Sequence, residues 1–255
     1  MNYPMLAAAL LLAAPFATAA EGPLKDKALA LAAVNKDSVL FLSAVVEVEL
    51  TAGDNPVKKE ERKVEILGTV IGADGLIVVP LSTLDVASMI DGRTMNGPQG
   101  PIKISAKGTT KEVKILMPDG LEVPAKVAFK DPDLDLAFIR PEKPAEVKLT
   151  PVNIADNAPL AVLDDVIILG RLGKDLNREP VIMTNEVIAL ITKPRTFAKL
   201  GSAALGMPVF NKDGKFLGLG INRFSAKGDS DSQGPMPSSV VLPAADLVES
   251  AAQAK

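Results

Sequence analysis

The sequence offers serine and lysine side chains for nucleophilic chemistry, but it contains no histidine and no cysteine. A serine nucleophile needs a base to take its proton, and histidine is the side chain whose ordinary pKa suits that task near neutral pH. Burial can lower the pKa of a lysine, so a Ser–Lys pair that uses Lys199 or Lys215 stays open, although exposed lysine is the commoner state. The histidine count alone excludes the usual mechanism of a serine hydrolase.

Two short motifs in residues 227–234 are similar in sequence to known functional motifs. Gly228-Asp229-Ser230 has the letters of a serine-nucleophile motif, and Asp229 and Asp231 match part of a calcium loop. The position at which that loop needs a bidentate glutamate is Val240. We interpret the segment as a surface loop. Since no phosphate-binding glycine motif is present either, we expect no metal and no cofactor.

The first 20 residues predict a secretory signal peptide. They contain an apolar run over residues 5–14 and small residues at 17–20, so we expect cleavage near Ala19 or Ala20. The run is about half the roughly 20 residues that a spanning helix needs. The sequence therefore predicts a periplasmic or secreted protein with no stable membrane span after cleavage.

The composition predicts a folded globular protein, because 47% of the 255 residues are hydrophobic. The 28 basic and 31 acidic residues leave a net charge of -3, which argues against a nucleic-acid partner. Without cysteine, an exported protein must be stabilised by packing alone.

Short β-branched and apolar runs, separated by turn residues, predict many strands. Asp74-Gly75 and Asp119-Gly120 are strong hairpin signals, whereas residues 86–108 resemble a long irregular loop. Four prolines within residues 140–159 indicate a linker between two halves, and residues 243–253 predict a helix. The pattern indicates an all-β barrel or sandwich with one terminal helix. The expected strands cover residues 39–50, 64–71, 76–81, 111–117, 121–129, 134–139, 166–170, 180–191, 206–210, 216–221 and 239–242.

Five segments in order resemble the HtrA/Deg family of trypsin-like proteases: residues 68–78, 123–139, 166–170, 184–189 and 206–219. The DPDLDLAFI sequence of residues 131–139, for example, is similar to the family segment that carries the catalytic aspartate. The resemblance implies a trypsin-like double β-barrel of two six-stranded barrels with the active site between them. We expect the first barrel in residues 36–148, the second barrel with the C-terminal helix in residues 149–255, and no PDZ domain.

The same resemblance implies that the catalytic machinery is degenerate. Ser82 occupies the position of the catalytic histidine, and Leu205 that of the nucleophilic serine. Ala203 replaces a glycine whose backbone N–H belongs to the oxyanion hole, where alanine resists the required geometry. Of the triad, only Asp135 remains, and without an imidazole to orient we expect it to cap local backbone N–H groups.

These observations favour an exported, catalytically inactive trypsin-like protein that binds peptide or protein. Family members hold substrate as an added strand against the second barrel, and main-chain pairing does not require the triad. Leu205, Met207 and Asn222 would then line the former specificity cleft, unless Leu205 and Met207 are simply core. The partner could be an active protease, an unfolded envelope protein or a second copy. An active serine endopeptidase with a non-standard site and an inert structural envelope protein remain the alternatives.

Overall fold

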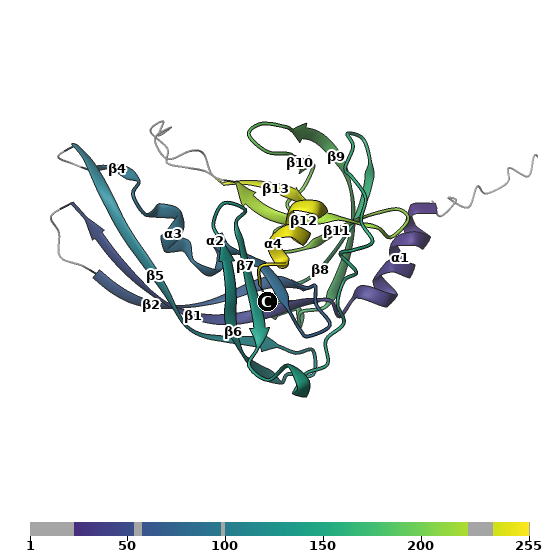
Figure 1. Ribbon diagram of the computed structural model, residues 1–255, viewed down its shortest axis with the longest axis horizontal. Helices are drawn as coiled ribbons and strands as arrows, with labels where there is room; N and C mark the ends of the chain where they lie inside the picture. Colours follow the sequence, from purple (N-terminus) through teal and green to yellow (C-terminus); the bar gives the residue numbers. More distant parts are fainter. Residues whose placement is uncertain (1–22, 54–57, 98–99, 224–236, 255) are drawn as a thin grey trace, which may run out of the picture.

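The computed structural model describes residues 23–53, 58–97, 100–223 and 237–254, and in these ranges the chain forms two closed β-barrels (Figure 1). Each ring has six strands, and neighbouring strands run antiparallel. The prediction of an all-β double barrel with a C-terminal helix is confirmed.

The first barrel is closed by pairing between β5 and β1. β4 (Thr94–Gly97) lies outside the ring and forms a hairpin with the start of β5. In the order in which they neighbour one another, the ring strands are β1 (Val39–Ala52), β2 (Lys58–Val70), β3 (Ile77–Pro80), β7 (Leu136–Pro141), β6 (Glu122–Asp131) and β5 (Gly100–Leu116).

The second barrel follows after the chain leaves β7 and crosses over through the 3₁₀ turn η1 (Pro144–Glu146). A further 3₁₀ turn, η2 (Lys174–Leu176), lies between its first two strands. In ring order its strands are β10 (Phe197–Leu200), β13 (Ser238–Pro243), β12 (Phe216–Arg223), β11 (Pro208–Asn211), β8 (Asp165–Arg171) and β9 (Pro180–Ile191).

The predicted turns and the terminal helix are present. Asp74-Gly75 joins β2 to β3 and Asp119-Gly120 joins β5 to β6, with φ of 81° at Gly75 and 89° at Gly120. Glycine reaches such positive φ values without steric cost, which is why these dipeptides were informative. Helix α4 (Ala244–Ala251) begins directly after Pro243.

Residues 86–108 do not form the irregular loop that the sequence suggested. They contain helix α3 (Val86–Ile90), strand β4 and the first half of β5, while α2 (Leu81–Leu84) precedes them. β5 continues through this region because β1 pairs with it as far as Ala52 and Ile104. With β2 and β4, these strands form an arm that extends away from the barrels on the left of Figure 1. The glycines and prolines in this region favoured a loop in the sequence analysis. The first half of β5 forms nevertheless, because it pairs with β1, which is distant in the sequence.

A fourth helix of the described chain, like α2 and α3, was not predicted. Helix α1 (Pro23–Asn35) lies beside the second barrel, where Ala28 and Ala32 are buried one turn apart in the shared hydrophobic cluster. No helix in the described part of the chain is long and apolar enough to cross a membrane.

The two barrels share a hydrophobic core. In β7, Leu136 and Phe138 face a cluster to which the second barrel contributes Phe216, whereas Ala137 and Ile139 face the interior of the first barrel. All four β7 side chains are fully buried. A strand buried on both faces has a continuous apolar sequence instead of an alternating one. The residues at the ends of β3, β7 and β12 are therefore held firmly where the barrels meet.

Candidate active site

Ser82 and Asp135 lie in direct contact at the junction between the barrels. The Ser82 backbone N–H donates to Oδ1 of Asp135 at 2.6 Å, and the Ser82 hydroxyl donates to Oδ2 at 3.0 Å. The backbone N–H of Leu81 donates to the Asp135 carbonyl at 2.8 Å. Asp135 adopts φ of 58° in the turn between β6 and β7, a conformation that Asp tolerates better than most residues. Asp135 therefore holds the first turn of α2 against β7.

Asn222, near the end of β12, connects the second barrel to this pair. Its backbone N–H donates to Oδ2 of Asp135 at 2.9 Å, and its side-chain Nδ2 donates to the Ser82 Oγ at 3.1 Å. The Ser82 oxygen thus accepts from Asn222 while its proton points to the carboxylate. The Ser82 hydroxyl and the Asp135 carboxylate thus form a connected hydrogen-bond network with Asn222. This network fixes the relative position of the two barrels.

Burial raises the pKa of Asp135 from an ordinary 3.8 to about 6. The backbone N–H groups of Asn222 and Ser82, the Ser82 hydroxyl and the nearby Arg223 lower the pKa, but less than burial raises it. Asp135 is 4% exposed and Ser82 is 7% exposed. Neither side chain is open to a substrate, and a carboxylate with this pKa is far too weak a base to ionise a serine hydroxyl.

Leu205 lies at the same junction, in a segment that precedes β11. It forms an isolated parallel bridge with Gly220, two residues before Asn222, and it is half-buried. The next residue, Gly206, has φ of 74°, and a Cβ there would lie 2.3 Å from the Leu67 carbonyl oxygen. Thr69 of β2 donates its hydroxyl to the Gly206 carbonyl at 2.9 Å. The segment around Leu205 and Gly206, where the resemblance places the nucleophile, therefore packs against the first barrel and is hydrogen-bonded to it.

The other two predicted site residues lie on either side of Leu205. Ala203 is exposed and is not among the described residues with positive φ. Met207 is half-buried and packs against the core of the second barrel, where a Cβ on Gly170 would come within 2.9 Å of its sulfur. Met207 thus contributes to packing, while Ala203 faces solvent.

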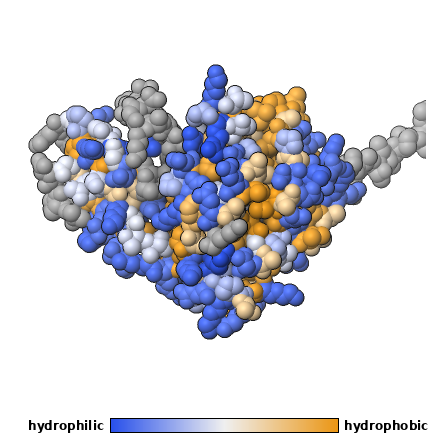
Figure 2. Space-filling view, viewed as in Figure 1, coloured by the Kyte–Doolittle hydropathy of each residue, from blue (hydrophilic) through white to orange (hydrophobic). Residues whose placement is uncertain are grey.

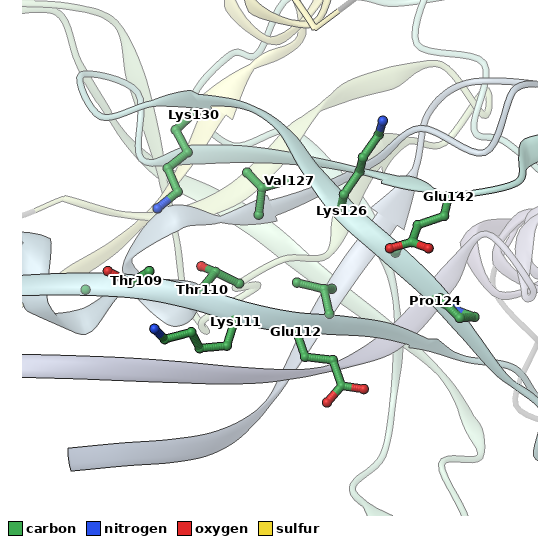
Figure 3. A pocket seen from close by; sticks show the side chains of 12 residues that line it. Thr109, Thr110, Lys111, Glu112, Pro124, Lys126, Val127, Lys130 and Glu142 are labelled. Carbon is green, nitrogen blue, oxygen red and sulfur yellow. The ribbon is translucent and has the colours of Figure 1, made fainter.

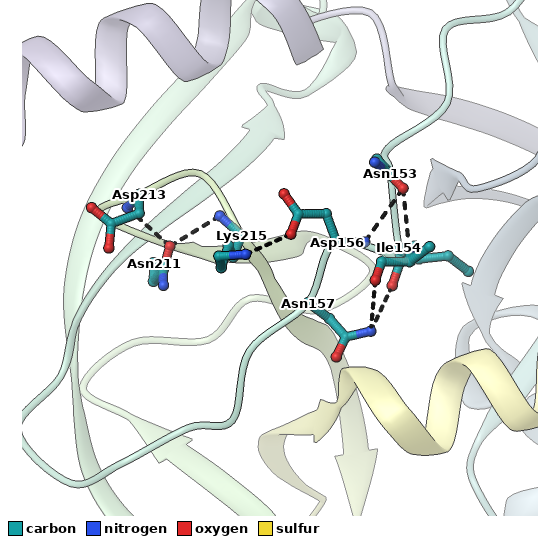
Figure 4. A network of polar contacts seen from close by, with 8 residues as sticks. Asn153, Ile154, Asp156, Asn157, Asn211, Asp213 and Lys215 are labelled. Carbon is teal, nitrogen blue, oxygen red and sulfur yellow. Dashed lines mark hydrogen bonds and ion pairs between the residues drawn. The ribbon is translucent and has the colours of Figure 1, made fainter.

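Neither lysine candidate for a Ser–Lys pair is arranged as a base. Lys199 donates to the Ser239 carbonyl at 2.8 Å. Lys215 donates to Asp156 at 2.7 Å in an exposed polar network, and this hydrogen bond raises the pKa of Lys215 (Figure 4). A general base needs the opposite shift. Ser202 is exposed and hydrogen-bonded to Asn185.

Several predicted features lie outside the described residues. One is the signal peptide of residues 1–20 with its cleavage near Ala19 or Ala20. The others are the serine-nucleophile-like motif Gly228-Asp229-Ser230 and the partial calcium loop that includes Asp231. In the part of the chain that the structure does describe, no three carboxylate side chains gather in a way that could hold a metal ion.

The comparisons with known proteins agree with this geometry. The family model of the trypsin-like peptidase domain matches residues 68–219, which is more than half of the chain. The chain therefore belongs to the trypsin-like peptidase family, and the resemblance to trypsin-like proteases drawn from the sequence is confirmed at this level.

Among solved structures, one similar fold is that of the MamO protease domain from Magnetospirillum magneticum in its apo form. The two chains are 16% identical with a TM-score of 0.52, and the match covers 85% of this chain and 96% of the other. At this identity the likeness shows the shared fold. No curated protein sequence matches the chain.

Sequence reasoning missed part of the junction. Asn222 was expected in a cleft, but not as a donor to both Ser82 and Asp135. Thr69 and Arg223 were not considered, and Arg223 places its guanidinium 5.0 Å from the Phe197 ring and donates to the Asp133 carbonyl at 3.4 Å. No local motif marks these residues, because each acts across a long separation in sequence.

Proposed function

We propose that this chain is an exported, catalytically inactive member of the trypsin-like family, similar to HtrA/Deg proteins, that binds peptide or protein partners in the periplasm or outside the cell. The observation that carries the proposal is the Ser82 hydroxyl, which donates to Asp135 in the position of the catalytic base. The sequence has no histidine that could take its place.

The chemistry of the junction supports inactivity. Acyl transfer needs a nucleophile, a base and donors for the oxyanion. Leu205 carries no nucleophilic atom, Ser82 is no base, and the Asp135 carboxylate already accepts three hydrogen bonds. Restoring one group alone would leave the other two requirements unmet.

The preserved junction supports binding. The Asn222–Asp135 and Thr69–Gly206 hydrogen bonds both link the two barrels, so two separate contacts hold the framework of the junction in place. Half-buried Leu205 and exposed Ala203 present side chains and backbone at this junction. Main-chain pairing with an extended peptide does not require the catalytic triad. On the face shown in Figure 2, hydrophobic surface gathers over the second-barrel side, whereas the arm is mostly hydrophilic.

A cleavage assay tests the inactivity. The chain from residue 21 onward is incubated with denatured casein and, separately, with a fluorophosphonate probe that labels activated serines, with an active trypsin-like protease as control. We expect neither cleavage nor labelling. Labelling at a defined serine would overturn the proposal.

A binding assay tests the second half of the proposal. Fluorescent peptides from a casein digest are titrated with the wild type, with Leu205→Glu, and with Ser202→Glu as the matched control three residues away. Leu205→Glu should weaken binding at least tenfold, because it places a charge at the barrel junction, while Ser202→Glu changes an exposed side chain. Equal affinities for all three proteins would contradict binding at this site.

A further inference from the structure

Strands β5 and β6 pair over only a short part of their length. Val113 to Leu116 of β5 pair with Ala125 to Glu122 of β6. β5 extends back to Gly100 and β6 continues to Asp131, but beyond the paired residues the two strands separate (Figure 3). The wall of the first barrel therefore contains an opening, which we call the β5–β6 gap and define by residues 109–112 of β5 and 126–130 of β6.

Both strands present unpaired edges to this gap. On its other side, β5 pairs with β1, for example Thr109 with Glu47, and β6 pairs with β7, for example Lys126 with Arg140. Within the described residues no strand pairs with the edges that face the gap. Backbone N–H and C=O groups on a strand edge are strong hydrogen-bonding groups, and an open edge is a template for a further strand.

The gap is bounded at both ends. At one end lies the paired part of β5 and β6, and at the other the Asp85 carboxylate accepts a hydrogen bond from Lys130 at 3.2 Å. The same carboxylate lies against Gly108, where a Cβ would come within 2.0 Å of Oδ1. The open stretch of β5 is thus four residues long, or about 13 Å at the usual rise of a strand.

The cavity in the gap is polar and large enough for a short segment of chain. Its volume is about 580 Å³. Thr110 points into it from β5, and Val127 and Lys130 point into it from β6 (Figure 3). The Thr110 hydroxyl oxygen is buried yet has no hydrogen-bond partner among the described residues. Because that oxygen is not accessible from the cavity, an occupant would bond to the backbone groups of the strand edges instead.

Irregularities in both strands lie at the gap. The register of β5 against β1 shifts between Val45 and Val46, so Lys111 is opposite no residue of β1, although its Nζ lies 3.0 Å from the Glu47 carboxylate. The register of β6 against β7 shifts between Val127 and Phe129. Such bulges bend a strand and direct its edge away from its neighbour, and they often lie beside functional sites. They explain why β5 and β6 separate at this point.

We propose that the β5–β6 gap is a second binding site, which takes an extended segment of about four residues from a partner protein as an added β-strand. The edges supply main-chain pairing, and the bounded length limits the segment. No large aromatic or leucine side chain is among the residues that line the cavity, so the gap does not suit the apolar face of a helix. This site lies on the first barrel and is independent of binding at the barrel junction.

The absence of cysteine makes a direct blocking test feasible. Hexapeptides are selected from a random phage library against the wild-type chain, and each selected peptide is synthesised with a fluorophore. Its affinity is measured by anisotropy for Thr109→Cys carrying a bulky maleimide, because Thr109 is exposed and lines the cavity. Glu61→Cys carrying the same label is the matched control on exposed β2. We expect at least a tenfold loss with the label at position 109 and no change with the label at position 61.

Hydrogen exchange locates the bound peptide. In the free protein, the amides of residues 109–112 that point into the gap should exchange at least tenfold faster than paired amides of residues 113–116. A bound peptide should slow them at least tenfold, and N-methylation of alternate peptide residues should abolish both binding and protection. Leu205→Glu should leave this binding unchanged, which separates the site from the barrel junction.

Three results would overturn the proposal. One is a selection that yields no peptide sensitive to the label at position 109. The second is protection confined to residues other than 109–112 and 126–130. The third is concentration-dependent self-association in sedimentation experiments that the same label abolishes, which would make the occupant a second copy instead of a partner protein.

Discussion

Asn222 of the second barrel donates its backbone N–H to the Asp135 carboxylate of the first barrel, 87 residues earlier in the chain, at 2.9 Å. This hydrogen bond makes the Asp135 carboxylate a contact between the two barrels. Asp135 also accepts from Ser82, so this one carboxylate holds two barrels and one helical turn together. The following predictions test the consequences of this and related contacts.

Asp135 should make the protein more stable at mildly acidic pH than it would be without this residue. Its pKa is about 6 in the folded protein and 3.8 at its ordinary value, so the folded state binds the proton more tightly. This contribution is fully present below pH 3.8 and is lost as pH rises through 6, a change of about 3 kcal/mol. Urea unfolding at pH 4.5 and 7.5 should show about 2 kcal/mol of this change, because the carboxyl of the unfolded chain is already mostly ionised at pH 4.5. Asp135→Asn should lack the component, and an identical pH dependence in the variant and the wild type would refute the assignment.

Leu205→Ser alone should not create a protease. The new hydroxyl would lie at the position that the resemblance to HtrA/Deg proteases gives to the nucleophile, but Ser82 cannot take its proton and the chain has no histidine. Casein cleavage and fluorophosphonate labelling should both remain at background, with Leu205→Ala as the control for the lost side chain. Labelling of the serine variant would reveal a base that the structure does not suggest.

Arg171 should be a major determinant of stability, because it clamps the second barrel to the start of the first. Its side chain is 6% exposed and donates to the Val39 carbonyl at 2.5 Å, to the carbonyls of Arg178 and Lys36 at 3.0 Å each, and to Asp37 at 3.0 Å. Arg171→Met would leave buried carbonyl oxygens without donors, at a cost of about 2–4 kcal/mol in the free energy of unfolding.

The matched control for Arg171 is Arg195→Met. The Arg195–Asp246 ion pair is 2.9 Å long and the arginine is largely exposed, so its loss should cost under about 1 kcal/mol. Both values come from urea unfolding. Similar losses for the two variants would show that burial of Arg171 does not matter.

Gly206→Ala should destabilise the barrel junction, whereas Gly173→Ala should not. Gly206 has φ of 74°, and the added Cβ would lie 2.3 Å from the Leu67 carbonyl oxygen. Strain and displacement of the segment should cost about 1–3 kcal/mol. Gly173 has φ of -66° and no atom within 4 Å of the added Cβ. Thermal unfolding of the two variants compares them, and equal midpoints would count against the tight junction.

The sequence by itself determined those features that depend on neighbouring residues. Alternating or continuous apolar runs bounded by Asp-Gly turns predicted most strands, and the order of short motifs predicted the double barrel. Comparison of motifs also identified Ser82, Asp135 and Leu205 as positions of interest. The absence of histidine required no structure, since no fold can supply a residue type that the chain does not contain.

Only the tertiary structure decided how these residues meet. The full length of β5 depends on pairing with β1, and the contact of Asn222 with Ser82 and Asp135 joins residues 140 and 87 positions apart. The β5–β6 gap likewise arises because each strand follows its other partner and bulges away from the first. Local propensity cannot encode such contacts, because their free energy comes from burial and hydrogen bonds that exist only after distant segments have packed together.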